Sequence, residues 1–344
     1  VGGTTAANPY RFFAQYPGVN VTIPESLNSP NVSEYTLGAG TAFGRGYARL
    51  DYISREWSDF YALRTTGESV PDPLGQLADL QEIYIDNSYN RSYDGVSLQA
   101  SYPLTPQLNI GGNYTWSETV GNVLAETAGN GPVTEVAQQY PEFRAFAQNN
   151  PTGFLPNDQT HKLRAWATWT VPTAVGNFTF SALQRYDTGT PYSALGTVNF
   201  LAATNDEGGL LYPYVSLQND YETGPATINY YFSDRGGFRW DDVSSLDLSI
   251  NYRLNFGRFE FFVQPELINA FNENAVINGD TTILTADCEC NDLQPFNPFT
   301  ETPVQGVHWD YSRDDNGQSV FGTARNYLDY QLARTFRISA GIRF

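Results

Sequence analysis

The sequence of 344 residues lacks methionine altogether, and it has only two cysteines, two histidines and 19 Lys and Arg residues against 37 Asp and Glu residues. The net charge of −18 leaves no basic stripe that could neutralise phosphates, so we expect no nucleic-acid partner. Two cysteines are too few for a disulfide scaffold. Because a genomic chain begins with Met, we expect Val1 to open a processed or truncated product.

Long apolar runs are also missing, and the mean hydropathy is −0.39. The uncharged stretches 95–117 and 165–184 contain prolines and paired small residues and are rich in Ser, Thr, Asn and Gln. A membrane-spanning helix needs about 20 mostly apolar residues, so each stretch is predicted to form two strands around a turn. Aromatic residues, at 15%, favour strands as well.

What the sequence has instead is a repeated alternation of apolar and polar residues. In 244–256, SSLDLSINYRLNF, every second residue from Leu246 to Phe256 is apolar, while polar residues such as Asp247 and Asn251 fill the gaps. A period of two places the two sets on opposite faces of a strand. The pattern predicts nine strands, at about 34–42, 46–62, 91–103, 107–120, 160–171, 177–189, 244–256, 258–271 and 328–344.

The predicted connections follow a rule that points to the fold class. Short turns alternate with long polar segments, as they do in transmembrane β-barrels with short periplasmic turns and long extracellular loops. A soluble sandwich would have to expose the aromatic face, which would aggregate in water. We therefore predict an all-β, antiparallel transmembrane β-barrel whose last residue, Phe344, lies on the periplasmic side. The short turns are expected at 43–46, 104–106, 172–176 and 257, and the long segments at about 63–90, 121–159, 190–243 and 272–327.

Nine strands do not complete such a barrel, because bacterial single-chain barrels use an even number of strands. An unclosed sheet in lipid would leave a row of unsatisfied backbone groups. We expect residues 1–344 to form the C-terminal part of a single β-barrel domain, with the first strands and an N-terminal plug outside this sequence.

Two segments resemble TonB-dependent outer-membrane receptors. ELINAFNENAV, at 266–276, resembles their penultimate strand, which ends on an Asn and a Phe-Asn pair, here Asn269 and Phe271-Asn272. YQLARTFRISAGIRF resembles their terminal strand. Further segments, among them SYNRSYDGVSLQASY, QRYDTGTPYSA and YYFSDRGGFRWDDVSSLDL, follow the order of the Oar-like branch, which carries a carboxypeptidase-regulatory-like domain. Ala333 departs from the Pro that is usual there.

The resemblance implies a barrel of about 22 strands, with a plug and a box that binds TonB. It implies a non-enzymatic protein of the outer membrane of a Gram-negative bacterium that takes up or handles a large solute. The implied partners are outer-membrane lipid, TonB and the outer-membrane insertion machinery. That machinery would recognise the terminal strand through Phe336, Ile338, Ala340, Ile342 and Phe344. The alternatives are a passive porin and a structural or adhesion barrel.

Candidate ligand residues gather in the last long segment, and no catalytic constellation is visible. An aromatic side chain beside polar groups could stack on a sugar or a peptide, although a structural turn explains the same residues. The candidates are His308, Trp309, Asp310, Tyr311, Asp314 and Asp315.

Cofactors and metal sites are not expected from the sequence. SRDDNGQS, at 312–319, has the acidic oxygens of a calcium loop but lacks the spacing of an EF-hand, so loop-bound calcium is a secondary hypothesis. Cys288 and Cys290 are predicted to form a strained loop disulfide rather than to remain free thiols, and two thiols alone do not make a closed metal site. Aromatic girdles at the membrane interface are expected from Trp57, Trp116, Trp166, Trp169, Trp240 and Tyr327.

Overall fold

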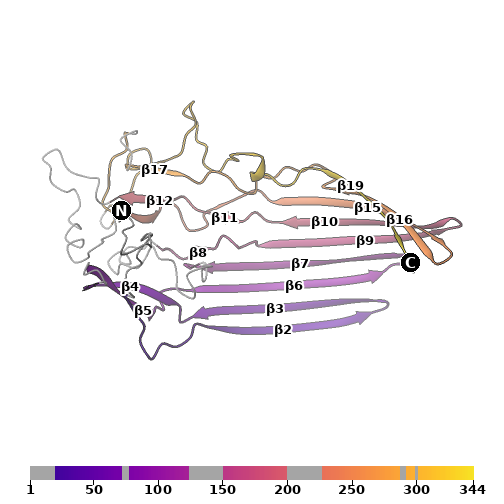
Figure 1. The fold of residues 1–344 in the computed structure, drawn as a ribbon, viewed down its shortest axis with the longest axis horizontal. Coiled ribbons are helices and arrows are strands. Elements are labelled where there is room, and N and C mark those ends of the chain that lie inside the picture. The colour runs from indigo at the N-terminus through magenta and orange to yellow at the C-terminus, as the bar shows by residue number, and fades with distance from the viewer. Residues whose placement is uncertain (1–19, 72–76, 124–149, 200–226, 287–291, 299–300) are drawn as a thin grey trace, which may run out of the picture.

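A computed structural model describes residues 20–71, 77–123, 150–199, 227–286, 292–298 and 301–344. Nine long strands form one antiparallel sheet in the spatial order β19-β16-β15-β10-β9-β7-β6-β3-β2 (Figure 1). Each strand pairs with neighbours in sequence, so the chain runs as an up-and-down meander. The strands are β2 (Asn31–Phe43), β3 (Gly46–Ser58), β6 (Arg91–Pro103), β7 (Leu108–Gly121), β9 (His161–Thr173), β10 (Gly176–Asp187), β15 (Val243–Phe256), β16 (Phe259–Ile268) and β19 (Thr335–Arg343).

These nine strands are the nine that the alternation predicts, which confirms the all-β, antiparallel fold class. The largest boundary error is in the last strand, which was predicted from residue 328 but begins at Thr335. The second strand, predicted to residue 62, ends at Ser58. The preceding residues form a short 3-10 turn, η4 (Tyr327–Asp329), which the side chain of Asn326 caps. Closure into a barrel and the number of 22 strands stay predictions.

The short turns gather at one end of the sheet and the long connections at the other (Figure 1). Gly44, with φ 59°, and Gly257, with φ 62°, take the left-handed conformation in the turns β2-β3 and β15-β16, which glycine adopts at little cost. The predicted sorting of the connections is therefore confirmed.

The two faces of the sheet differ as the alternation requires. Residues paired directly across neighbouring strands share a face, and Phe261, Val263 and Leu267 lie opposite Ile342, Ala340 and Phe336. This apolar face is exposed: Phe336 is 68% and Ile338 62% accessible. Glu56, Asp94 and Glu118 interrupt it only near the end with the long connections.

The opposite face is polar, and its carboxylates are neutralised by arginines on the same face. Every carboxylate that the nine strands place on it forms an ion pair with an arginine, so few charges there lack a counter-ion. Oppositely charged neighbours across strands stabilise a sheet modestly. Arg49 pairs with Asp51 within β3. The pairs across strands are Arg55–Glu34, Arg164–Asp187, Arg185–Asp247, Arg337–Glu266 and Arg343–Glu260.

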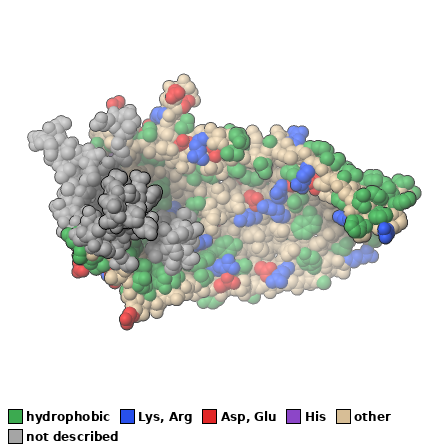
Figure 2. Space-filling model, in the orientation of Figure 1, with side chains coloured by type: hydrophobic (Ala, Val, Ile, Leu, Met, Phe, Trp, Pro, Cys, Tyr) green, Lys and Arg blue, Asp and Glu red, His purple; other side chains and the backbone are tan. Residues whose placement is uncertain are grey.

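In Figure 2, acidic and basic side chains lie side by side along the middle of the molecule, and hydrophobic side chains cover the end that carries the short turns. Exposed residues at that end include Val175 at 66%, Phe256 at 74% and Phe344 at 99%. An apolar surface of this kind is rare on a water-soluble protein.

The end with the long connections carries additional short strands. Residues 63–90, predicted as a loop, contain most of a hairpin of β4 (Tyr61–Pro71) and β5 (Leu77–Ile85), to which β1 (Val21–Thr22) adds in parallel. Phe60, Ala62, Tyr89 and Val123 form a buried cluster beneath it. The other additions are β8 (Gly153–Phe154), β11 (Pro191–Tyr192), β12 (Leu195–Asn199), β13 (Thr227–Tyr231), β14 (Phe238–Arg239), β17 (Ile283–Thr285) and β18 (Trp309–Tyr311).

The expected aromatic girdle was wrong for three tryptophans. Trp57 packs on the buried cluster under the hairpin, Trp166 lies on the polar face beside Leu183, and Trp240, only 9% accessible, stacks on Tyr192. Trp169 is 50% accessible on the apolar face, where it contacts Phe180. The described residues include no helix long and apolar enough to cross a membrane.

Candidate ligand groove on the polar face

The predicted ligand residues around β18 lie inside a small aromatic core between the long connections. Trp309 is only 7% accessible and packs on Phe232, with 5.0 Å between ring centroids. Tyr311 stacks on Phe321 at 4.3 Å, and β18 pairs with β17. Sequence reasoning thus located an aromatic cluster, but its rings contact one another. A ligand-binding role for these residues stays a prediction.

Three of the four polar members of the same set, His308, Asp310 and Asp314, also have partners within this segment. The Nδ1 of His308 accepts a hydrogen bond from the backbone N–H of Val304. Arg313 pairs with Asp310 at 2.7 Å. The backbone N–H groups of Gln318 and Asn316 donate to Asp314 and lower the pKa of that carboxyl. Asp315 is exposed.

Metal binding gains no support from this loop. In the part of the chain that the structure describes, no three His, Cys, Asp or Glu side chains come together in a way that could hold a metal ion. The carboxylate of Asp314 instead closes a turn onto its own backbone. Cys288 and Cys290, the predicted disulfide, lie outside the described residues.

Asn269 and Asn272, singled out by the sequence, anchor the loop between β16 and β19. Asn269 has φ 52° and is 1% accessible. Its side-chain amide donates to the carbonyl oxygens of Glu273 and Leu332, both at 2.8 Å. The backbone N–H of Arg334 donates to the side chain of Asn272 at 3.0 Å. The two asparagines hold the departing and returning ends of the loop together, a structural role.

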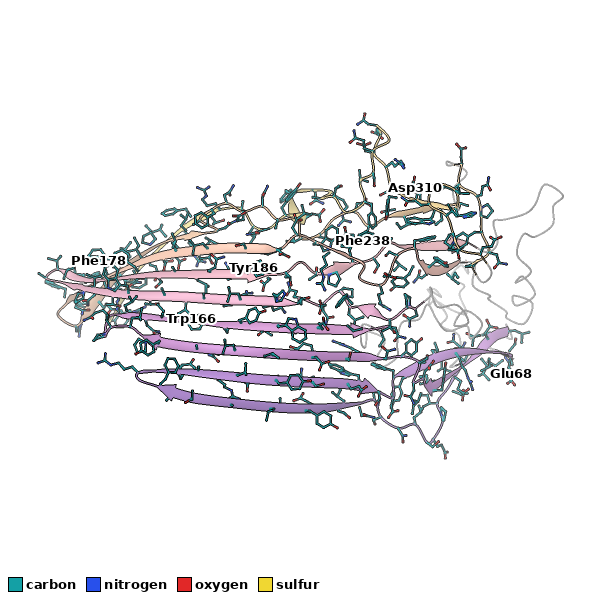
Figure 3. The ribbon with its side chains drawn as sticks, turned by 180° about the vertical axis from the view of Figure 1, so that it is seen from behind. Glu68, Trp166, Phe178, Tyr186, Phe238 and Asp310 are labelled. Carbon is teal, nitrogen blue, oxygen red and sulfur yellow. The ribbon has the colours of Figure 1, made fainter. Side chains whose placement is uncertain are left out.

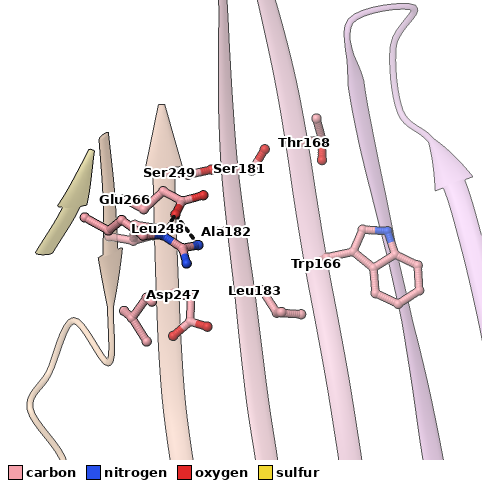
Figure 4. Close-up of a pocket in the computed structure, with 11 residues that line it drawn as sticks. Trp166, Thr168, Ser181, Ala182, Leu183, Asp247, Leu248, Ser249 and Glu266 are labelled. Carbon is pink, nitrogen blue, oxygen red and sulfur yellow. Dashed lines mark hydrogen bonds and ion pairs between the residues drawn. The ribbon is translucent and has the colours of Figure 1, made fainter. Parts of the chain in front are cut away.

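A hollow of about 460 Å³ lies on the polar face, across β9, β10, β15, β16 and β19. One row of directly paired residues runs across it: Thr168 opposite Ser181, Ser181 opposite Ser249, and Ser249 opposite Glu266. The row continues to Arg337 on β19. We call this hollow the polar-face groove; Figure 4 shows its lining.

A second row in the polar-face groove is largely apolar. Trp166 lies opposite Leu183, and Leu183 lies opposite Asp247. Both charged ends of the groove are neutralised, because Arg337 pairs with Glu266 at 2.5 Å and Arg185 pairs with Asp247. The groove therefore presents an aromatic and aliphatic side, a side of hydroxyl groups, and ion pairs along one margin.

Two further hollows lie nearer the long connections. One of about 420 Å³ is lined by Tyr192, Trp240 and the guanidinium of Arg235, among others. Arg235 is 5% accessible and donates to the carbonyl oxygen of Asn122 at 2.7 Å. The other, about 230 Å³, lies between Arg185, Asp187 and the returning loop at Gln331. Figure 3 shows Trp166 on the sheet, far from Phe238 and Asp310 at the loop end.

No protein-family model and no curated protein matches the chain. Its fold is similar to several solved structures, three of which are named here. These are BauA, the ferric preacinetobactin receptor of Acinetobacter baumannii (10% identity, TM-score 0.41, 71% of this chain and 26% of that chain), the outer membrane transporter YddB of Escherichia coli (14%, 0.43, 75% and 31%), and the ferripyoverdine receptor of the outer membrane of Pseudomonas aeruginosa (11%, 0.35, 74% and 25%).

The chain thus spans less than a third of the length of each of these proteins. At such identities and TM-scores the likeness is one of fold, and it carries no information about ligands.

The polar-face groove was missed by sequence reasoning, which assigned Trp166 to the membrane interface. The signal was present in the alternation. Trp169 and Trp166 are three residues apart, so in one strand they must lie on opposite faces, and only one of them can meet lipid. The row of hydroxyls across three strands could not be found, because it depends on the register between strands.

Proposed function

We propose that this chain is part of the barrel of a TonB-dependent outer-membrane receptor of the Oar-like branch, which takes up or handles a large solute. The observation that carries the proposal is the division of the nine strands into an exposed apolar face and an ion-paired polar face. The sorting of short turns and long connections to opposite ends supports it.

The division of the faces matches lipid outside and water inside. Transmembrane barrels alternate apolar residues outward with polar residues inward, and the charged residues of this sheet lie almost entirely on one face. In water the same sheet would expose large apolar residues along most of its length, which favours aggregation. Lipid removes that cost, so the apolar face is proposed to contact the outer membrane.

The unpaired edges of the sheet support the proposal that it is part of a larger barrel. Within the described residues, β2 and β19 each pair with one neighbour only. In lipid, unpaired backbone groups at these edges would be expensive, so further strands are proposed to close the sheet. The chain would then be the C-terminal part of the barrel domain, and a plug and a TonB-binding box would lie in the remainder of the protein.

Transport rather than chemistry on the solute is the proposed activity, so the protein is not an enzyme. The long connections would face the cell exterior and the polar face would line the lumen. A passive porin would share this wall but would not depend on TonB. An adhesion barrel would share it as well but would import nothing.

Fractionation and topology test the proposal together. The full-length protein should co-purify with the outer membrane of the Gram-negative cell that makes it. Protease added to intact cells should cut within 121–159, 190–243 or 272–327 and spare the turns at 104–106 and 257. Cytosolic recovery, or cuts confined to those turns, would overturn the membrane assignment.

Energy coupling separates the receptor from its alternatives. Growth that depends on the solute should disappear when TonB is deleted. Unchanged growth would exclude the receptor, and it would leave the porin and the adhesion barrel to be separated by whether solute still enters the cells.

A further inference from the structure

We infer that the hollow of about 420 Å³ between the long connections binds an organic carboxylate with an apolar body. This substrate class rests on the proposed function, in which the long connections face the cell exterior. The space is called the loop-end hollow below. Its lining comes from the connections, its charge comes from a buried arginine, and one edge of that arginine has no hydrogen-bond partner.

The loop-end hollow lies beyond the wall of the sheet. Its lining residues belong to the three connections 122–160, 188–242 and 269–334. The first two connections pack tightly, since a Cβ built on Gly153 would come within 2.3 Å of the carbonyl oxygen of Arg235. The second is bonded to the third, because the backbone N–H of Asp241 donates to the carbonyl oxygen of Val276 at 3.0 Å. The lining is thus supplied within this sequence, without a plug or further strands.

The charge of the loop-end hollow is opposite to that of the chain as a whole. The chain has 37 Asp and Glu residues, but the described residues that line the hollow include none of them, and Arg235 is their one charged side chain. Arg235 is only 5% accessible and forms no ion pair with a described residue. Burial of an unpaired charge is costly. A bound anion would therefore supply the counter-ion that the surrounding residues do not.

The guanidinium of Arg235 is held in place through one nitrogen. Its Nη1 donates to the carbonyl oxygen of Asn122 at 2.7 Å and to the side chain of Asn150 at 2.8 Å. The group also lies over the ring of Tyr231, at 5.2 Å from the centroid. Nε and Nη2 form no hydrogen bond with a described residue. These two nitrogens share one edge of the guanidinium, and that edge binds a carboxylate through two parallel N–H···O bonds.

The rest of the lining favours an apolar body on the ligand. Tyr192 stacks on Trp240 with 4.0 Å between ring centroids. The hydroxyl of Thr190 and the side-chain amide of Asn278 form no hydrogen bond with a described residue. A mainly apolar space with a few polar groups is typical of sites for small molecules. The apolar lining residues are Phe154, Pro156, Pro191, Leu195, Trp240 and Ile277.

Calorimetric titration of the full-length protein, purified from the outer membrane in detergent, tests the inference. The probes are 2-naphthoate and indole-3-acetate, each compared with its uncharged amide, 2-naphthamide or indole-3-acetamide. At least one carboxylate should bind, and its amide should bind about tenfold or more weakly, because the charge-assisted hydrogen bonds to Arg235 are lost. Arg235→Lys keeps the charge but removes the paired donors, so it should weaken carboxylate binding about tenfold.

The matched control is Arg313→Lys, at an exposed arginine that already pairs with Asp310; it should leave the affinity unchanged. If Arg235→Lys does not assemble, Asn278→Trp decides, because it fills the hollow from an exposed position and keeps Arg235. The inference is overturned if neither carboxylate binds, if an amide binds as tightly as its acid, if inorganic phosphate competes at equal concentration, or if an assembled variant of Arg235 or Asn278 binds with native affinity.

Failure of this inference is distinguishable from failure of the proposed function. Heat-modifiable migration and outer-membrane recovery of the same samples report whether the barrel exists. A barrel that assembles but binds neither carboxylate removes the carboxylate inference alone.

Discussion

Apolar side chains are exposed on the nine-stranded sheet and buried in the aromatic cluster between the long connections. The sheet exposes them, with Phe256 at 74%, Phe336 at 68% and Ile338 at 62% accessible, whereas the cluster buries Trp309 at 7% and Phe296 at 3%. The two regions of one chain therefore differ in where their apolar side chains lie. The difference indicates two solvents: the cluster folds as proteins do in water, and the sheet is adapted to a surrounding that is itself apolar.

A charge introduced on the apolar face should have the largest effect, because it tests whether this face contacts lipid. Ile250→Arg places a guanidinium among exposed residues of β15, where arginine costs about 2–4 kcal/mol near the middle of a bilayer. We expect little assembled protein in the outer membrane, measured by heat-modifiable migration. The matched control, Asn251→Arg, adds the same charge on the polar face and should assemble. Equal assembly of both variants would contradict a lipid-facing side.

The end of β19 should matter nearly as much. Phe344 is 99% accessible and makes no large contribution to packing here. If the terminal strand is an assembly signal, deletion of Phe344 should reduce assembled protein several-fold, while Phe344→Tyr keeps the aromatic ring and should retain most of it. Quantitative immunoblots of outer-membrane fractions would measure the ratio. Native levels after the deletion would remove the signal role.

The loop cluster should respond to a lost apolar side chain as a water-soluble core does. Trp309→Ala should lower the local free energy of unfolding by about 3–5 kcal/mol, seen as faster hydrogen exchange in β17 and β18. The sheet should assemble normally. Tyr327→Ala, at a residue 82% accessible, is the control and should leave exchange unchanged. Retained protection in Trp309→Ala would show that the cluster is not a core.

The junction between the two regions depends on Asn269. Replacement by Ala removes the hydrogen bonds to the carbonyl oxygens of Glu273 and Leu332 and disfavours the positive φ, so a loss of about 1–3 kcal/mol is expected. Asn269→Gly keeps the conformation and loses only the hydrogen bonds, so it should lose less. Hydrogen exchange at Glu273 and Arg334 would report the loosening. Equal losses in the two variants would assign the effect to the hydrogen bonds alone.

The smallest effect is a pH dependence in the loop. The guanidinium of Arg325 and then its backbone N–H donate to Asp329, and these hydrogen bonds hold the pKa of Asp329 below the usual 3.8. A depressed carboxyl pKa stabilises the folded state above 3.8, and that stabilisation is lost as the pH falls through the folded-state pKa.

Hydrogen exchange at Ile277 and Asn278, whose N–H groups donate to the carbonyl oxygen of Asp329, should therefore accelerate at acidic pH in the native protein. In Asp329→Asn this acid-dependent step should be absent. The same acid response in both proteins would assign it to other groups.

The sequence by itself determined the strands, their faces and the sorting of the connections, because a side-chain period of two and the residues of tight turns are local properties. The alternation in 244–256 was enough to place Leu248 and Asp247 on opposite faces of the sheet. The hairpin at 61–85 was not predicted because its alternation is weak. Trp166 was misplaced although the alternation puts it on the face opposite Trp169. Trp57 and Trp240 were misplaced because their packing on the long connections is not a local property.

Only the tertiary structure decided which residues meet across strands. The hydroxyl row of Thr168, Ser181 and Ser249 comes from three strands, and the ring of Trp166 needs the missing side chain of Gly111 on a fourth. Such contacts depend on register and on which strands are neighbours, and no local pattern encodes either. For that reason the apolar face of the sheet could be predicted from the sequence, whereas the groove on the polar face could not.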